Sequence, residues 1–165
     1  MSTIALGGGC HWCTEAIFHA LKGVDLVQQG WVSSFEEAES FSEAVVVHFD
    51  PELIPLEILI EIHLLTHNAT SMHSMRKKYR SAIYTYSEQQ AEEVNTILKQ
   101  KATLFSKKII TKVYPFQAFK SNEERYLNYY EKNKSKPFCK TYITPKLQLL
   151  LQSHKRYLQE DSKAI

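Results

Sequence analysis

The residue types that could do chemistry in this sequence gather in one glycine-rich stretch, LGGGCHWCTEA at residues 6–16. Three glycines leave space around the sulfur of Cys10 and permit backbone conformations with positive φ. Apolar residues recur at helical spacing from Ala16 onward, so we expect Cys10 at the N-terminus of a helix. Unpaired backbone N–H groups and the positive end of the helix dipole favour a thiolate there, which makes the cysteine a nucleophile at neutral pH. The alternative is a small buried cysteine packed in a tight turn.

The number and spacing of the cysteines point to redox chemistry or metal binding. The chain contains three, an odd number that argues against a framework of structural disulfides. Cys10 and Cys13 lie one helical turn apart, close enough for a disulfide, whereas Cys139 stands alone in a polar connection. A structural zinc site would need all three and a histidine, and such sites usually add a second close pair. We therefore favour redox chemistry over zinc binding.

Length, charge and composition restrict the kind of protein. A chain of 165 residues suits one domain with a substantial core. A formal net charge of +2 and scattered lysines argue against a nucleic-acid partner. No secretory signal is visible, and the apolar runs are too short to span a membrane. We expect a cytoplasmic monomer that binds neither nucleic acid nor membranes.

Strand and helix patterns alternate on both sides of the cysteine turn. We predict strands at residues 3–6, 24–33, 44–49, 80–86 and 109–114, and helices at 12–21, 55–64, 87–105, 121–132 and 144–158. Two capping boxes, beginning at Ser87 and Ser121, mark the starts of two of these helices.

The order of these elements, βαββαβ followed by αβα, indicates the fold class. It predicts an α+β fold of the split βαβ (ferredoxin-like) type, a two-layer sandwich with a mostly antiparallel sheet and helices packed against it. We expect a single domain over residues 1–165, in which residues 140–165 form an extra C-terminal helical tail.

Four blocks of the sequence resemble the A-type peptide-methionine sulfoxide reductases, in order and in approximate spacing. They are GCHWCTE at 9–15, FSEAVV at 41–46, YRSAIY at 79–84 and EERYLNYY at 123–130, within a similarity that covers about residues 3–139. The resemblance implies reduction of methionine S-sulfoxide, free or in proteins, to methionine, without a cofactor. It makes Cys10 the nucleophile that becomes a sulfenic acid, which condenses with a second thiol. Thioredoxin is the implied partner that reduces the resulting disulfide.

The resemblance assigns the acid of this reaction to Glu43. Its role would be to protonate the sulfoxide oxygen, which is a poor leaving group without a proton. An exposed glutamate at a strand edge is the alternative reading. Residues 34–42 are shorter than the family's loop before this acid and lack its tyrosine. The donor that this tyrosine would provide is therefore missing or comes from elsewhere.

Four further residues are implied to bind substrate. Trp12 would form the apolar wall that holds the substrate's methyl group, or else is a core tryptophan at the helix start. His11 stands where the family has phenylalanine, and either donates a hydrogen bond or helps to hold a thiolate. Glu124 and Tyr129 match an acid and a tyrosine of the family's site. A capping box at Ser121 would explain Glu124 equally well.

The resolving cysteine is left open by the sequence. Cys139 matches a C-terminal cysteine of the family, and Cys13 replaces a glycine. We favour Cys139, because a flexible tail can reach a recessed sulfenic acid, although the two could act in relay. A thiol–disulfide oxidoreductase that does not act on sulfoxides, with the CxxC pair as its whole chemistry, is the alternative function. An inactive reductase-like domain that binds oxidised proteins is a further one.

Overall fold

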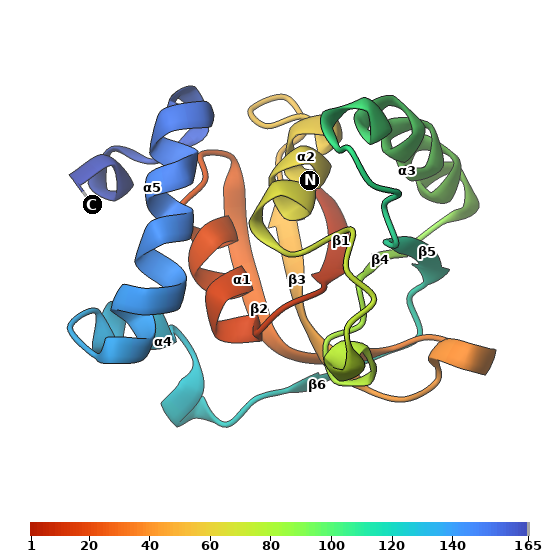
Figure 1. Ribbon diagram of the computed structural model, residues 1–165, viewed down its shortest axis with the longest axis horizontal. Coiled ribbons are helices and arrows are strands. Elements are labelled where there is room, and N and C mark those ends of the chain that lie inside the picture. The colour runs from red at the N-terminus through yellow and green to blue at the C-terminus, as the bar shows by residue number, and fades with distance from the viewer. Residues whose placement is uncertain (165) are drawn as a thin grey trace.

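The computed structural model describes residues 1–164, in which strands and helices form a curled sheet with helices against it (Figure 1). The strands of this part of the chain are β1 (Ser2–Gly7), β2 (Val24–Ser33), β3 (Ser42–Phe49), β4 (Ala82–Thr85), β5 (Lys112–Pro115) and β6 (Ala118–Ser121). They lie side by side in the order β5-β4-β1-β3-β2-β6. The pairs β1–β3, β1–β4, β2–β3 and β2–β6 are antiparallel, and β4–β5 is parallel.

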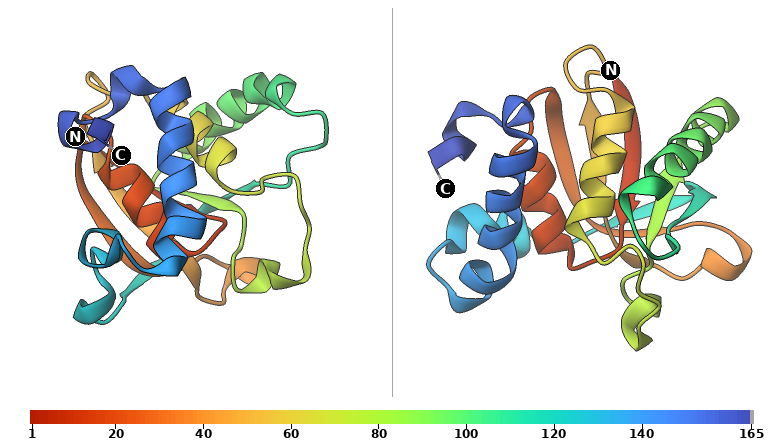
Figure 2. Two further views of the ribbon diagram at one scale, coloured as in Figure 1. Left: turned by 60° about the vertical axis from the view of Figure 1, so that its left-hand side comes forward. Right: turned by 45° about the horizontal axis from the view of Figure 1, so that its top comes forward.

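The helices pack mainly on one face of the sheet. They are α1 (His11–His19), α2 (Leu56–Thr66), α3 (Glu88–Lys101), α4 (Tyr129–Asn133) and α5 (Thr144–Ser153). Figure 2 shows α1 and α2 against the strands, with α5 beside α1. Alternate strand residues face these helices, so Val45 and Val47 of β3 join the large core while Val46 joins a smaller cluster on the other face. Both faces of β3 are therefore buried, which explains its continuous apolar run.

Most of the predicted elements are confirmed with small shifts of their ends. The strand at 24–33 has the predicted bounds, and Ser87 caps α3 by accepting the N–H of Gln90 at 3.1 Å. The last helix ends at Ser153, earlier than predicted. No helix within residues 1–164 is long and apolar enough to cross a membrane.

The capping box predicted at Ser121 is wrong. Ser121 ends strand β6, and its hydroxyl donates to the carbonyl of Asn122 instead of accepting an N–H. A short 3₁₀ turn, Glu124–Tyr126, follows, and α4 begins only at Tyr129 after Asn128, whose φ is 55°. Gly30 makes this possible, because a Cβ there would lie 2.0 Å from the carbonyl oxygen of Lys120 in the adjoining strand β6.

Candidate active site

Cys10 lies at the N-cap of α1, where β1 and the glycine turn deliver it to the start of the helix. Its carbonyl accepts the N–H groups of Cys13 and Thr14 at 3.0 and 3.1 Å. Its side chain is partly buried. A hydrogen bond from the Cys13 thiol lowers the pKa of Cys10, and the N–H groups of Trp12 and Cys13 add to this effect against burial and the charge of Glu43. The geometry therefore favours a thiolate at Cys10.

Cys13 and Cys139 lie close behind Cys10, and all three cysteines are free thiols. The hydrogen bond to Cys10, together with burial, raises the pKa of Cys13, which is 3% exposed. Cys139 begins a π-helical turn, Cys139–Ile143, and is fully buried. Burial raises the pKa of Cys139, with a smaller contribution from Cys10. The two buried cysteines are therefore thiols beside a more acidic one.

Cys139 does not lie on the flexible, polar tail that the sequence predicts. Phe138, the residue before it, packs edge-on against Trp12 with ring centroids 5.4 Å apart. Cys139 itself joins Ile143 and Leu147 in the large core. The polar residues of this segment face outward, and the apolar ones fix the cysteine against α1. Tail flexibility is thus removed as a reason to prefer Cys139 over Cys13.

A buried polar network holds the glycine turn from behind. The Nε2 of His63 donates to the carbonyl of Gly7 at 2.7 Å, and the guanidinium of Arg76 donates to the carbonyl of Gly8 at 2.7 Å. Gly8 has a φ of +152°, and a Cβ there would lie 2.4 Å from the ring of His67. Only glycine fits this position. The turn is therefore fixed by hydrogen bonds to its carbonyl groups.

Glu43 faces the nucleophile turn from β3. Its Oε1 accepts the backbone N–H of His11, the residue after Cys10, at 3.2 Å. The same oxygen lies 3.3 Å from Nε2 of His11, and Oε2 lies 3.7 Å from Nζ of Lys78. Glu43 is 6% exposed, so the alternative reading of an exposed glutamate at a strand edge is wrong. A carboxyl group is thereby held at the mouth of α1.

The ring of His11 is buried beneath the nucleophile turn. The side chain is 4% exposed, and its Nδ1 donates to the carbonyl of Gly30 at 2.7 Å. The ring packs edge-on against Trp31 with centroids 5.1 Å apart. Its position under the turn instead brings Nε2 to Glu43. The ring therefore contacts the acid, and a substrate-binding role for His11 stays a prediction.

Trp12 lies within an aromatic cluster, which we define as Trp12, Tyr126, Tyr129 and Phe138. The rings of Tyr129 and Tyr126 stack on Trp12 with centroid distances of 4.0 and 5.7 Å. Burial raises the pKa of Tyr129, and the charges of Cys139 and Cys10 add to it. The structure thus brings Trp12 and Tyr129 together beside Cys10.

Glu15 was not singled out from the sequence, although it lies in the same motif. Its carboxylate accepts the N–H groups of Asn128 at 2.9 Å and Tyr129 at 3.2 Å, and the amide of Gln29 at 3.0 Å. The side chain is 7% exposed. Its position two residues after Cys13 in the motif was the only available signal, because Asn128 and Tyr129 lie more than a hundred residues further on.

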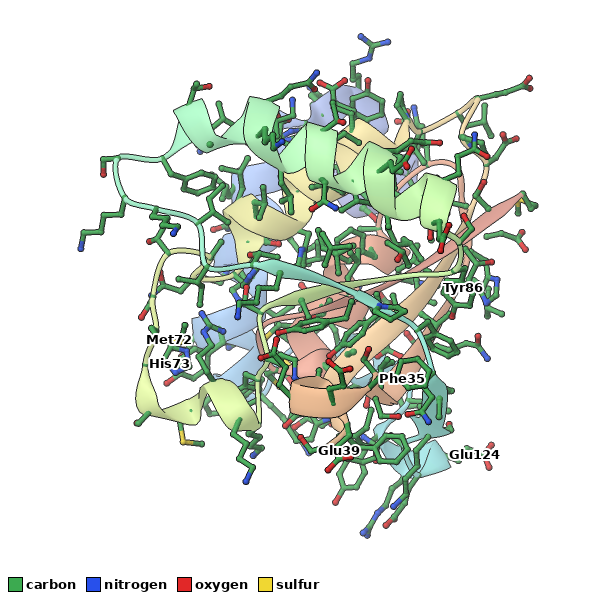
Figure 3. All side chains as sticks on the ribbon, turned by 90° about the vertical axis from the view of Figure 1, so that its right-hand side faces the viewer. Phe35, Glu39, Met72, His73, Tyr86 and Glu124 are labelled. Atoms are coloured by element: carbon green, nitrogen blue, oxygen red, sulfur yellow. The ribbon has the colours of Figure 1, made fainter. Side chains whose placement is uncertain are left out.

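Glu124 does not join the site. Its side chain is exposed, and Figure 3 shows it at the periphery beyond the end of β6. It begins the 3₁₀ turn that replaces the predicted helix. Phe35 in the short loop is also exposed (Figure 3). Within residues 1–164 no group of three or more His, Cys, Asp or Glu side chains is arranged to hold a metal ion.

A cysteine of lowered pKa at a helix start, with a buried carboxyl group and two further thiols beside it, defines a protein with a redox-active cysteine. A model of the peptide methionine sulfoxide reductase family matches residues 2–159. The peptide methionine sulfoxide reductase MsrA of Sulfolobus acidocaldarius is 33% identical over 167 residues, 93% of this chain and 95% of its own. This chain therefore belongs to the peptide methionine sulfoxide reductase family, as its sequence motifs indicate.

Two solved structures of Mxr1 from Saccharomyces cerevisiae share the fold. The reduced form matches with a TM-score of 0.74 at 24% identity, over 86% of this chain and 90% of that one. The complex of Mxr1 with Trx2 matches with a TM-score of 0.62 at 23% identity, over 75% of this chain and 82% of that one.

Proposed function

We propose that this chain reduces methionine S-sulfoxide, free or in proteins, to methionine, with Cys10 as nucleophile and Glu43 as acid. The observation that carries the proposal is the carboxyl group of Glu43 bonded to the N–H that follows Cys10. Opposite tasks are thereby assigned to two neighbouring groups, a thiolate that attacks sulfur and an acid that protonates oxygen. Family membership supports the same reaction.

The reductive step balances with one proton. The Cys10 thiolate attacks the sulfoxide sulfur, Glu43 gives its proton to the sulfoxide oxygen, and the oxygen ends on Cys10. The thiolate, the sulfoxide and one proton thus yield a sulfenic acid and the thioether methionine. The cysteine sulfur is oxidised by two electrons and the methionine sulfur is reduced by two.

Cys13 is the first resolving cysteine in this scheme. The two residues bracket the first turn of α1, and interaction with the Cys13 thiol lowers the pKa of Cys10. Attack by Cys13 on the sulfenic acid forms a Cys10–Cys13 disulfide and releases water. The Cys139 thiolate then attacks the sulfur of Cys13, which forms a Cys13–Cys139 disulfide and releases Cys10 as a thiolate. This order replaces the direct attack by Cys139 that the sequence favours.

Thioredoxin returns the enzyme to its reduced form. A dithiol partner reduces the disulfide and becomes a disulfide itself, so no cofactor is needed. The complex of the similar Mxr1 with Trx2 supports this partner. An odd number of three cysteines, which argues against a framework of structural disulfides, suits a reducing location such as the cytoplasm.

The architecture supports a finer classification of the fold. We infer a split βαβ (ferredoxin-like) sandwich, because β4, β1, β3 and β2 are adjacent in this order and each strand is antiparallel to its neighbour. We also infer one domain, since Leu147 and Leu150 of α5 pack into the same core as α1. Residues 140–164 are then a C-terminal helical segment attached to that domain, and Ile165 lies outside the described residues.

Stereospecific turnover tests the function. With dithiothreitol as reductant, the protein should convert methionine S-sulfoxide to methionine and leave the R epimer unchanged. Cys10→Ser should abolish the reaction, and Glu43→Gln should slow single-turnover release of methionine by about a hundredfold. Turnover of neither epimer, with normal reduction of a model disulfide, would identify the alternative thiol–disulfide oxidoreductase.

The choice of reductant distinguishes the roles of Cys13 and Cys139. Dithiothreitol can reduce a sulfenic acid directly, so Cys13→Ser and Cys139→Ser should each reduce the sulfoxide repeatedly with it. Cys139→Ser should lose thioredoxin-supported turnover while still forming the Cys10–Cys13 disulfide. Cys13→Ser should accumulate sulfenic acid, which a dimedone probe would label. Rapid formation of a Cys10–Cys139 disulfide in Cys13→Ser would restore direct attack by Cys139.

A further inference from the structure

We propose that Gln29 is a positioning residue that controls how closely two tyrosines cover Trp12, and thereby makes the site select a methyl sulfoxide. The inference rests on the proposed function, because Trp12 serves as the methyl wall only in that reaction. The two tyrosines are Tyr126 and Tyr129, on the segment of residues 122–129 that follows β6. Gln29 acts through this segment, to which its side chain is hydrogen-bonded, and not on the substrate itself.

Gln29 is a polar residue on the side of the sheet that faces the helices. It lies on β2 opposite Val45 of β3, which belongs to the large core, and it is 1% exposed. Residues that lie directly opposite each other on neighbouring strands share a face of the sheet. A buried side-chain amide is costly unless its donors and its acceptor are all bonded. The partners of Gln29 therefore indicate what the residue holds in place.

Both donors and the acceptor of the Gln29 amide are used. Its Nε2 donates to Oε1 of Glu15 at 3.0 Å and to the carbonyl of Tyr126 at 2.9 Å. Its Oε1 accepts the side-chain amide of Asn122 at 2.7 Å. A rotated amide would direct its oxygen at a carboxylate and a carbonyl, neither of which can donate. The network therefore permits one orientation of Gln29.

These bonds hold the segment that carries the tyrosines at both of its ends. At its start, the backbone N–H of Asn122 also donates to the carbonyl of Gln29 at 3.1 Å. At its end, Glu15 accepts the N–H groups of Asn128 at 2.9 Å and Tyr129 at 3.2 Å. Because Gln29 donates to the same carboxylate, it also fixes the direction of that carboxylate. The segment is thereby tied to β2 and α1.

The segment held in this way brings two rings onto Trp12. The ring centroids of Tyr129 and Tyr126 lie 4.0 and 5.7 Å from that of Trp12. A methyl group that packs on Trp12 must displace the nearer ring, that of Tyr129. Because both ends of the segment are bonded, the ring can move only a short way, and the space that it opens suits a methyl group better than a longer alkyl group. One methylene too many in such a pocket lowers kcat/KM by roughly tenfold to two-hundredfold.

Gln28, the preceding residue, provides a matched control. It has the same side chain on the same strand but points to the other face of the sheet, where it is exposed. Its Oε1 accepts Nε2 of His48 at 2.8 Å. Neither residue belongs to the segment that covers Trp12. Replacement of Gln28 therefore tests the loss of a glutamine from β2 without the loss of the network.

The substrate preference of the protein tests this inference. With dithiothreitol as reductant, kcat/KM is measured for the S-sulfoxides of methionine and of its S-ethyl analogue, ethionine. The wild-type protein should favour the methyl compound by about tenfold or more, and Gln29→Met, which keeps the length but not the bonds, should reduce this preference to about threefold or less. Gln28→Met should keep the wild-type preference. A loss of folded protein does not change the ratio, because both substrates meet the same folded fraction.

A milder variant and a second measurement guard against a Gln29 variant that fails to fold. Asn122→Ala removes a half-buried partner of Gln29 and should lower the methyl preference in the same direction by a smaller factor. Amide hydrogen exchange does not depend on activity. The N–H groups of Asn128 and Tyr129 should exchange about fivefold faster in either variant, whereas that of Thr14 in α1 should not change.

Three results would overturn the inference. They are a wild-type protein that reduces both sulfoxides equally well, an unchanged methyl preference in Gln29→Met or, where that variant does not fold, in Asn122→Ala, and unchanged exchange at Asn128 and Tyr129. Failure of the wild-type protein to reduce methionine S-sulfoxide at all would instead overturn the proposed function.

Discussion

The two sides of the nucleophile are built by different means. On one side, His63 and Arg76 hold the carbonyl groups of Gly7 and Gly8 by buried hydrogen bonds. On the other side, the aromatic cluster around Trp12 is held mainly by ring stacking. Hydrogen bonds to carbonyl groups permit one geometry, whereas stacked rings can slide.

This difference matches what the proposed reaction needs from each side. The reductive step would need the Cys10 thiolate and Glu43 in a fixed relation, and the glycine side provides that. The substrate must first reach Trp12, which Tyr129 now covers, and a disulfide must afterwards pass to the buried Cys139. Both require the aromatic side to rearrange. We therefore expect substitutions in the glycine turn to reduce the free energy of unfolding most, and substitutions in the aromatic cluster around Trp12 to affect turnover.

Gly8→Ala should give the largest loss. The new Cβ would meet the ring of His67 at 2.4 Å with the backbone at a φ of +152°. We expect a loss of about 3 kcal/mol or more in the free energy of unfolding, measured by urea denaturation. Gly9→Ala is the matched control, because its Cβ would meet its nearest neighbour only at 3.9 Å. Equal losses in the two variants would remove the special role of Gly8.

The second largest effect should be a loss of stability in acid, caused by the histidines packed behind the glycine turn. Burial lowers the pKa of His63 to about 4 from 6.5, and it lowers the pKa of His67 as well. As the pH falls below 6.5, the histidines bind protons in the unfolded chain before they do so in the folded protein. The free energy of unfolding is therefore highest above pH 6.5 and decreases between pH 6.5 and about 4. His63 alone accounts for about 3 kcal/mol of that loss.

Urea midpoints across the same pH range measure this effect. His63→Gln can still donate to the carbonyl of Gly7 but does not titrate. Its stability should therefore fall less steeply with acid than that of the wild-type protein. The same slope in both proteins would show that His63 is not the titrating group.

Glu15→Gln should weaken the aromatic side by a smaller amount. The two carboxylate oxygens accept the N–H groups of Asn128 and Tyr129. The side-chain amide of glutamine has only one oxygen, so one of these N–H groups would lose its acceptor. We expect a loss of about 1–2 kcal/mol and slower turnover with thioredoxin, with little change in single-turnover methionine release. The exposed Glu124→Gln serves as control and should behave as wild type. A larger effect on methionine release than on thioredoxin-supported turnover would contradict the expected difference between the two sides of Cys10.

Tyr129→Phe should change stability least. Its ring keeps the stack on Trp12, so the free energy of unfolding should move by no more than about 0.5 kcal/mol. If its hydroxyl bonds the sulfoxide oxygen, single-turnover methionine release should fall about tenfold. Tyr126→Phe, on the same tryptophan, should leave this rate unchanged. Similar rates in the two variants would leave Tyr129 as a packing residue only.

The sequence by itself determined the parts of this protein that depend on neighbours along the chain. The glycines before Cys10, the helix that follows it and the strand at 24–33 are short-range features, since turns and helix starts arise from adjacent residues. The family blocks added Glu43, Trp12 and Tyr129 as candidates. Each of these residues does lie around Cys10 in the folded chain, although their roles await the experiments above.

Only the tertiary structure decided contacts between distant residues. Glu43 and His11 are 32 positions apart, and Gly8 and Arg76 are 68 apart, so no local pattern connects them. The sequence Ser121-x-x-Glu124 suits a capping box, yet the small Gly30 lets this segment pair as strand β6 and carries Glu124 outward. Burial of Cys139 likewise follows from Phe138 and Ile143 packing into a core built by the rest of the chain. Long-range packing outweighs local preference, because it removes far more apolar surface from water.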